Sequence, residues 1–123
     1  MPFNKVILMG NLVRDPESKA LPSGGVVVNC GIAVTEKWTD KSTNTKREEV
    51  CFVDINMFGK TADNFIKHFS KGNAVLIEGR LKQDLWESDG NKRSKHRVQV
   101  DKWSFPPSPN KSNDGFGDDE DAF

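Results

Sequence analysis

Two aromatic residues stand at the same parity in residues 50–58 of this 123-residue chain. Phe52 and Phe58 fall at even positions, together with polar residues. The odd positions are uniformly apolar: Cys51, Val53, Ile55 and Met57. Because side chains of a strand alternate between two faces, the odd set is expected in the core and the aromatic set on a wetted surface.

The same division recurs in residues 73–86, where Trp86 shares a face with Arg80 and Lys82. The opposite face is expected to be core: Val75, Ile77, Gly79, Leu81 and Leu85. Flat rings beside cations suit a single-stranded nucleic acid, because every base can stack on a ring and Lys or Arg attracts phosphate. The alternative is that such rings pack under a loop, the helix or a partner subunit. Three of them beside basic residues favour binding.

Trp38 is ambiguous by parity alone. It falls in register with the apolar residues of the run 26–34, which predicts a core position. Glu36 lies in the same register, however, and Trp38 ends the run beside the polar loop 39–44. A bulge or a strong twist would turn the ring outward.

The elements that must position these residues are mostly strands, and the chain is expected to be mainly β. Strands are expected over 5–13, 26–38, 50–58, 73–86 and 94–105. A helix is expected over 61–70, because its apolar residues recur at helical spacing, with Thr61 as N-cap and Gly72 as stop. Five strands with one helix between the third and fourth is the element order of the OB-fold barrel, a fold that often binds oligonucleotides.

Charge divides the chain into two segments. Residues 1–105 carry 17 Lys and Arg against 13 Asp and Glu, whereas residues 106–123 carry one Lys and five acids. The second segment is too polar to bury much surface, so we expect a disordered acidic tail after an OB-fold domain of residues 1–105. A basic body with an acidic tail is a pattern typical of nucleic-acid binders.

Catalytic, metal and membrane signals are not apparent in the sequence. His68 and His96 have no neighbouring nucleophile or metal-ligand cluster, and Cys30 and Cys51 fit no metal spacing. We therefore expect neither an enzyme nor a cofactor or metal. The apolar runs are too short for a signal peptide or a membrane span, so we expect a cytoplasmic protein with reduced thiols, in the host cytoplasm or nucleoid if it is phage-encoded.

Several ordered segments resemble the bacterial-type single-stranded DNA-binding proteins, which coat DNA during replication. The matching segments are Asn4–Leu12, Asp15–Glu17, Phe58–Lys60, Lys71–Gly72 and Ile77–Leu81. The resemblance covers about residues 3–105 and resumes at the extreme C-terminus. It suits a bacterial, phage or plasmid member equally well, since only a short linker precedes the acidic tip.

The resemblance implies a set of stacking aromatics at Trp38, Phe52, Phe58 and Trp86. The family commonly has Trp where this chain has Phe52, which stacks over a smaller area. We expect basic groups to follow the phosphates, with these as candidates: Lys5, Arg80 and Lys82.

The resemblance also implies a homotetramer, built from dimers that pair through their first strands, and a tail that docks on replication and repair proteins. The family's tail ends in acids followed by Pro-Phe, and here the corresponding residues are Asp118, Asp119, Glu120, Asp121, Ala122 and Phe123. Ala122 replaces the proline, whereas the acids and the terminal ring of Phe123 are present. The alternative is a solubilising acidic end without a docking role.

The sequence thus predicts a sequence-independent single-stranded DNA-binding protein of replication, recombination and repair. Two alternatives remain open at this stage: an RNA-binding OB module, or a protein-interaction subunit whose barrel does not bind nucleic acid. Nothing in the sequence identifies a group that reads the 2′-hydroxyl of RNA.

Overall fold

The computed structural model describes residues 2–106. The predicted tail and its acidic tip therefore lie outside the described residues, apart from Pro106. In chain order the elements are β1 (Val6–Leu12), β2 (Glu17–Ala20), β3 (Val26–Asp40), β4 (Thr45–Phe58), α1 (Gly59–His68), β5 (Ala74–Ser88) and β6 (Asn91–Ser104).

Five of the strands close into a barrel in the order β1-β5-β6-β4-β3, and β1 then pairs with β3. The closing contacts are short, with Leu12 opposite Ile32 in the antiparallel β1–β3 pair and Ile55 opposite Val98 in the parallel β4–β6 pair. Gly79 lies beside a bulge in the β5–β6 pair, where a Cβ atom would collide with the carbonyl of Gln99. With α1 between β4 and β5, this is the OB-fold barrel that the sequence predicts.

Strand β2 was not predicted. It pairs with the start of β3, and all four of its residues are exposed. Since its sequence, ESKA, contains no apolar alternation, hydrophobic patterning gives no signal for a strand here.

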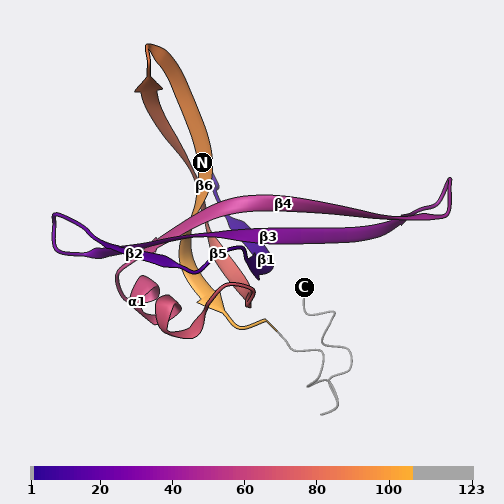
Figure 1. The fold of residues 1–123 in the computed structure, drawn as a ribbon, viewed down its shortest axis with the longest axis horizontal. Coiled ribbons are helices and arrows are strands. Elements are labelled where there is room, and N and C mark those ends of the chain that lie inside the picture. Colours follow the sequence, from indigo (N-terminus) through magenta and orange to yellow (C-terminus); the bar gives the residue numbers. More distant parts are fainter. Residues whose placement is uncertain (1, 107–123) are drawn as a thin grey trace.

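Two hairpins extend beyond the barrel as arms (Figure 1). We define the β3–β4 arm as residues 35–50 and the β5–β6 arm as residues 83–96. In Figure 1 the first runs horizontally and the second rises away from it. The β5–β6 arm ends in Asp89 and Gly90, both with positive φ, as a two-residue hairpin turn of type I′ requires.

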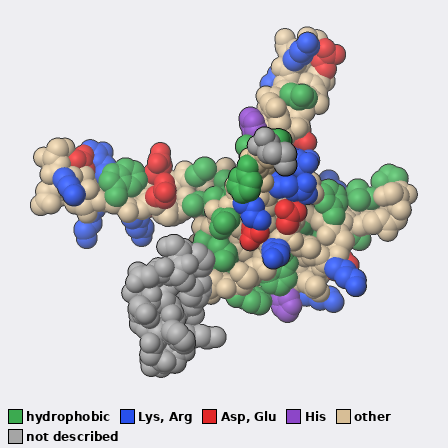
Figure 2. Space-filling model, turned by 180° about the vertical axis from the view of Figure 1, so that it is seen from behind, with side chains coloured by type: hydrophobic (Ala, Val, Ile, Leu, Met, Phe, Trp, Pro, Cys, Tyr) green, Lys and Arg blue, Asp and Glu red, His purple; other side chains and the backbone are tan. Residues whose placement is uncertain are grey.

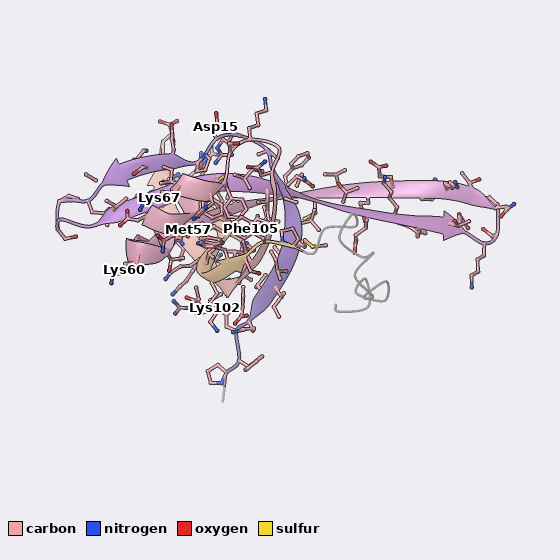
Figure 3. All side chains as sticks on the ribbon, turned by 90° about the horizontal axis from the view of Figure 1, so that it is seen from below. Asp15, Met57, Lys60, Lys67, Lys102 and Phe105 are labelled. Carbon is pink, nitrogen blue, oxygen red and sulfur yellow. The ribbon has the colours of Figure 1, made fainter. Side chains whose placement is uncertain are left out.

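The core lies inside the barrel and under the helix. Its fully buried side chains include Val28, Ile32, Ile55, Met57, Phe65, Val75, Ile77 and Val98. Figure 3 shows Met57 in this interior, whereas Lys60 and Lys67 lie on the outer side of α1. The buried set agrees with the parity expected for β3, for the second half of β4 and for the first half of β5.

Helix α1 differs in detail from the expected 61–70. Its N-cap is Phe58, which makes no side-chain capping bond, so Thr61 is not the cap. Phe65 and Phe69 stack with ring centroids 4.7 Å apart, and Trp103 packs edge-on against Phe69 at 5.1 Å. The Trp103 indole also donates a hydrogen bond to the Thr61 carbonyl (3.1 Å), which holds the helix against β6.

The core prediction was wrong for three residues on the arms or at their bases. Cys51 is exposed, Leu81 is 45% exposed and Leu85 is 74% exposed. Each has the parity of the core face, but an arm is a ribbon of two strands without a layer packed on either side. Both faces therefore meet solvent, and parity alone cannot show where a strand leaves the barrel.

Candidate nucleic-acid interface

The polar faces of β4 and β5 form one continuous surface, because β6 lies between them. Asn56 of β4 is opposite Gln99 of β6, and Gln99 is opposite Arg80 of β5. Residues that pair across neighbouring strands point to the same side of a sheet. We call this surface, on the side of β3–β4–β6–β5 away from the core, the outer face.

Three aromatic rings stand on the outer face, as predicted from parity. Phe52 is 72% exposed at the base of the β3–β4 arm, and Phe58 is 41% exposed at the end of β4. Trp86 is 46% exposed and lies opposite Arg93 on the β5–β6 arm. None of the three packs into the barrel, so each presents ring surface to solvent.

Trp38 has the parity of the core face, but it lies on the β3–β4 arm and is 48% exposed. Parity left this position undecided; the ring is exposed because the strand has already left the barrel, and no bulge interrupts the β3–β4 pairing. Trp38 is opposite Arg47 and lines a groove of about 510 Å³ together with these residues: Lys37, Thr39, Lys46, Arg47 and Glu48. A flat ring with cations nearby can stack on a base while a phosphate lies beside it.

The three predicted phosphate-binding residues have different surroundings. Arg80 donates a hydrogen bond to Asp101 (3.3 Å), whereas Lys82 makes no ion pair within the described part of the chain. Lys5 pairs with Glu78, and the Lys5 hydrogen bond lowers the pKa of the Glu78 carboxyl. Lys5 precedes β1, which lies on the other side of β5 from β6, whereas Lys82 is on the same face of β5 as Trp86.

A cleft of about 280 Å³ opens on the outer face. Its polar lining consists of Arg14, Asn29, Asp54, Asp84, Lys95 and Arg97. A further group of Lys and Arg side chains, with Asp or Glu side chains among them, is seen in Figure 2 where the β5–β6 arm joins the barrel.

Arg97 ties together the three strands around this cleft. Its Nε and Nη2 atoms donate to the two carboxylate oxygens of Asp84 on β5, at 2.8 and 3.2 Å. Its Nη1 atom donates to Oδ1 of Asn56 on β4 (2.7 Å), and Asn56 is only 5% exposed. A bidentate pair together with a buried amide fixes the guanidinium geometrically.

Sequence reasoning missed the basic residues of β6. Arg93, Lys95 and Arg97 alternate with the period of a strand, and the buried Val98 and Val100 fix their side as the outer one. That signal was present in the sequence. Arg14, which follows β1, gave no comparable signal, because only the tertiary structure brings it to the cleft.

Cys30 is buried and Cys51 is exposed, and both thiols are free. Residues 2–106 contain no group of three or more His, Cys, Asp or Glu side chains placed to hold a metal ion. None of the helices in these residues could cross a membrane.

Residues 3–106 match the model of the single-strand binding protein family, which accounts for nearly all of the described structure. The chain belongs to this family. It is 42% identical over 123 residues to the single-stranded DNA-binding protein of Wolinella succinogenes, a match covering 98% of this chain and 75% of the relative. It is 43% identical over 104 residues to that of Helicobacter pylori, covering 84% of this chain and 58% of the relative.

Solved structures of single-strand binding proteins share this fold. A deletion mutant of the single-stranded DNA-binding protein from Thermus aquaticus superposes with a TM-score of 0.74 at 27% identity, over 86% of this chain and 51% of that one. A complex of the Plasmodium falciparum protein with single-stranded DNA has a TM-score of 0.73 at 22% identity, over 85% and 93% of the two chains. This chain thus spans little more than half the length of some of its relatives.

Proposed function

We propose that this protein binds single-stranded DNA without sequence preference through its outer face and the β3–β4 arm. The observation that carries the proposal is the exposure of Phe52, Phe58 and Trp86 on one face that also presents Lys82 and the cations of β6. Membership of the single-strand binding protein family supports it, and so do the relatives named for this activity.

The mechanism follows from the chemistry of this face. Bases stack on the exposed rings, and each stack contributes about 1–3 kcal/mol whichever base is present. Lys and Arg side chains attract the phosphates and release counterions, so affinity falls as salt rises. Hydrogen-bond readout of base edges is not needed, and for that reason the preference among sequences is weak.

Sequence independence and the choice of sugar are tested by competition. Oligomers of thymidine, cytidine and mixed sequence should displace a labelled thymidine oligomer at similar concentrations, and a duplex should displace it poorly. A uridine ribo-oligomer that competes far better than the thymidine oligomer would favour the RNA-binding alternative. Failure of every nucleic acid to bind would favour a protein-interaction subunit.

We further propose a homotetramer, built from dimers that pair through β1. Ile7 is 60% exposed and Met9 is 46% exposed on this strand, so an apolar strip is available for a second copy. Light scattering should give the mass of four chains, and Met9→Lys should lower it. A wild-type monomer at micromolar concentration would contradict this assembly.

The acidic tip forms the last part of the proposal. Asp118–Asp121 and Phe123 supply charge and an apolar anchor for basic, hydrophobic pockets on replication, recombination and repair proteins, to which the protein brings coated DNA. Removal of residues 118–123 should abolish capture of such partners while the affinity for single-stranded DNA is kept. If the truncated chain captures the same partners as the full chain, the tip is not the docking segment.

A further inference from the structure

Two carboxylates occupy the middle of the surface that is proposed to receive a polyanion. Asp54 lies two residues from Phe52 on the same side of β4, and Asp84 lies two residues from Trp86 on the same side of β5. Both line the cleft on the outer face. An unpaired carboxylate there would repel phosphate, so the partners of each acid decide what it does.

Asp84 has a fixed partner. It accepts two hydrogen bonds from Arg97, whose third partner is the buried Asn56 amide, and the Arg97 side chain is only 26% exposed. Moving the Arg97 side chain away would break all three hydrogen bonds and leave the buried Asn56 oxygen without its partner. The hydrogen bonds of Arg97 therefore link β6 to β5 through Asp84 and to β4 through Asn56.

Asp54 is held loosely by comparison. Its Oδ2 atom pairs with Lys95 of β6, and its Oδ1 atom lies 4.0 Å from Nη2 of Arg14. The side chains of Lys95 and Arg14 are 57% and 50% exposed, so both can change partners at little cost. One carboxylate thus lies between two exposed cations, Arg14 from the segment after β1 and Lys95 from β6.

We propose that Arg14 and Lys95 form a binding site for a backbone phosphate of single-stranded DNA, and that Asp54 occupies the phosphate position in the free protein. This inference rests on the proposed function. When DNA binds, the phosphate replaces the carboxylate between the two cations. Asp54 then turns to solvent and takes up a cation from the salt.

The exchange has two measurable consequences. Affinity is lower than the cations alone would give, because the Asp54 ion pairs must be broken first. Salt dependence is also weaker, since each phosphate neutralised on a single strand adds about 0.7 to the slope of log K against log salt, and a cation taken up by Asp54 subtracts from it. In the same way, Asp54 lowers the affinity of Arg14 and Lys95 for anions other than DNA.

The test compares Asp54→Asn with Asp63→Asn, a matched loss of one exposed carboxylate on α1, away from the cleft. Asp54→Asn should bind a thymidine oligomer about threefold to fivefold more tightly than wild type. Between about 50 and 200 mM salt its slope should be steeper by up to about 0.7. Asp63→Asn should change neither quantity appreciably. An Asp54→Asn variant that binds no more tightly than wild type, or a gain equalled by Asp63→Asn, overturns the proposal.

A second pair of variants tests whether the gain acts through Lys95. In the Asp54→Asn background, Lys95→Gln should remove the gain in affinity and the added slope. The matched change Lys67→Gln, on the outer side of α1 (Figure 3), should leave both in place. Equal effects of the two lysine changes would mean that total charge is responsible, and the site would be rejected.

The two levels of the proposal fail differently. If wild type and Asp54→Asn both fail to bind at low salt, the proposed function fails, and this site with it. If wild type binds and Asp54→Asn matches it, the function stands and this site alone is wrong. Thermal unfolding of each variant verifies its fold, and Lys95→Gln alone, which should weaken wild-type binding, provides an independent check.

Discussion

Trp38 and Phe52 lie on opposite faces of the β3–β4 ribbon. Phe52 is opposite Ala33 and Trp38 is opposite Arg47 in one uninterrupted antiparallel register. Trp38 lies five positions along β3 from Ala33, and an odd offset places two side chains on opposite faces of a strand. Of these two rings, only Phe52 lies on the outer face, together with the cleft and Trp86. A strand of DNA that stacks on both rings must therefore pass around the edge of the arm.

This geometry predicts that the two rings respond differently to oligomer length. Phe52→Ala should weaken binding by about 1–3 kcal/mol for an oligomer of about ten nucleotides and for one several times longer. Trp38→Ala should have little effect with the short oligomer and a comparable loss with the long one. Fluorescence anisotropy of labelled oligomers measures both, and equal losses for Trp38→Ala at the two lengths would contradict the path around the arm.

Trp86 and its chain neighbour Leu85 provide a matched pair. They are exposed on opposite sides of β5, and only Trp86 is on the outer face. Trp86→Ala should weaken binding by at least about 1 kcal/mol, whereas Leu85→Ala should leave affinity unchanged. Because both side chains are exposed, neither variant should lose much stability in a denaturant titration. Equal effects on affinity would remove Trp86 from the interface.

Arg97 is expected to contribute to stability as well as to the charge of the interface. Arg97→Gln leaves the Asp84 carboxylate and the buried Asn56 oxygen without their partner, which should lower the free energy of unfolding by about 1–3 kcal/mol. Arg93→Gln, an exposed change on the same side of β6, should stay within about 0.5 kcal/mol of wild type. Urea unfolding monitored by circular dichroism measures both. If Arg97→Gln is as stable as wild type, the hydrogen bonds of Arg97 to Asp84 and Asn56 do not contribute to stability.

The two thiols should react at different rates. Cys30 is 1% exposed and lies near the carbonyls of Arg14 and Gly31, and burial raises the pKa of its thiol above the ordinary 9.0. Cys51 is exposed. A chromogenic disulfide reagent at mildly alkaline pH should label one thiol per chain at once and the second only on unfolding. Cys51→Ala should abolish the fast phase, and a fast phase that persists would contradict the burial of Cys30.

The pKa of Cys30 also gives a direction for stability at high pH. The pKa of the Cys30 thiol is higher in the folded protein than in the unfolded one. The contribution of this thiol to stability is therefore complete below the unfolded pKa, and it is lost as pH rises through the folded pKa. Wild type should therefore lose stability above about pH 9. The Cys30→Ala variant should be less stable than wild type at every pH, but its stability should fall less than that of wild type as pH rises above about 9.

Much of the fold could be predicted from the sequence because barrel strands have one dry face and one wet face. The alternation in residues 51–58 gave both the buried Ile55 and Met57 and the exposed Phe52. The arms could not be predicted in this way, since Leu85 and Trp38 carry a core pattern where no core exists. Strand β2 gave no apolar pattern at all.

The site was predicted in the same uneven way. Exposed rings give a signal because an aromatic residue at a polar parity is unusual, and the exposure of Phe52, Phe58 and Trp86 was predicted by that means. The Arg14–Asp54–Lys95 cluster could not be found, because it joins a loop and two strands that are distant in sequence. Its ion pairs depend on the closed barrel rather than on any local spacing.

The most direct measurement of the proposed function is a titration of tryptophan fluorescence with a thymidine oligomer at low and at raised salt. Stacking on Trp38 and Trp86 should quench the emission at low salt, and raised salt should reverse the quenching as phosphate contacts are lost. Emission that does not change at low salt, with the protein folded, would contradict stacking on these rings and with it the proposed binding of single-stranded DNA.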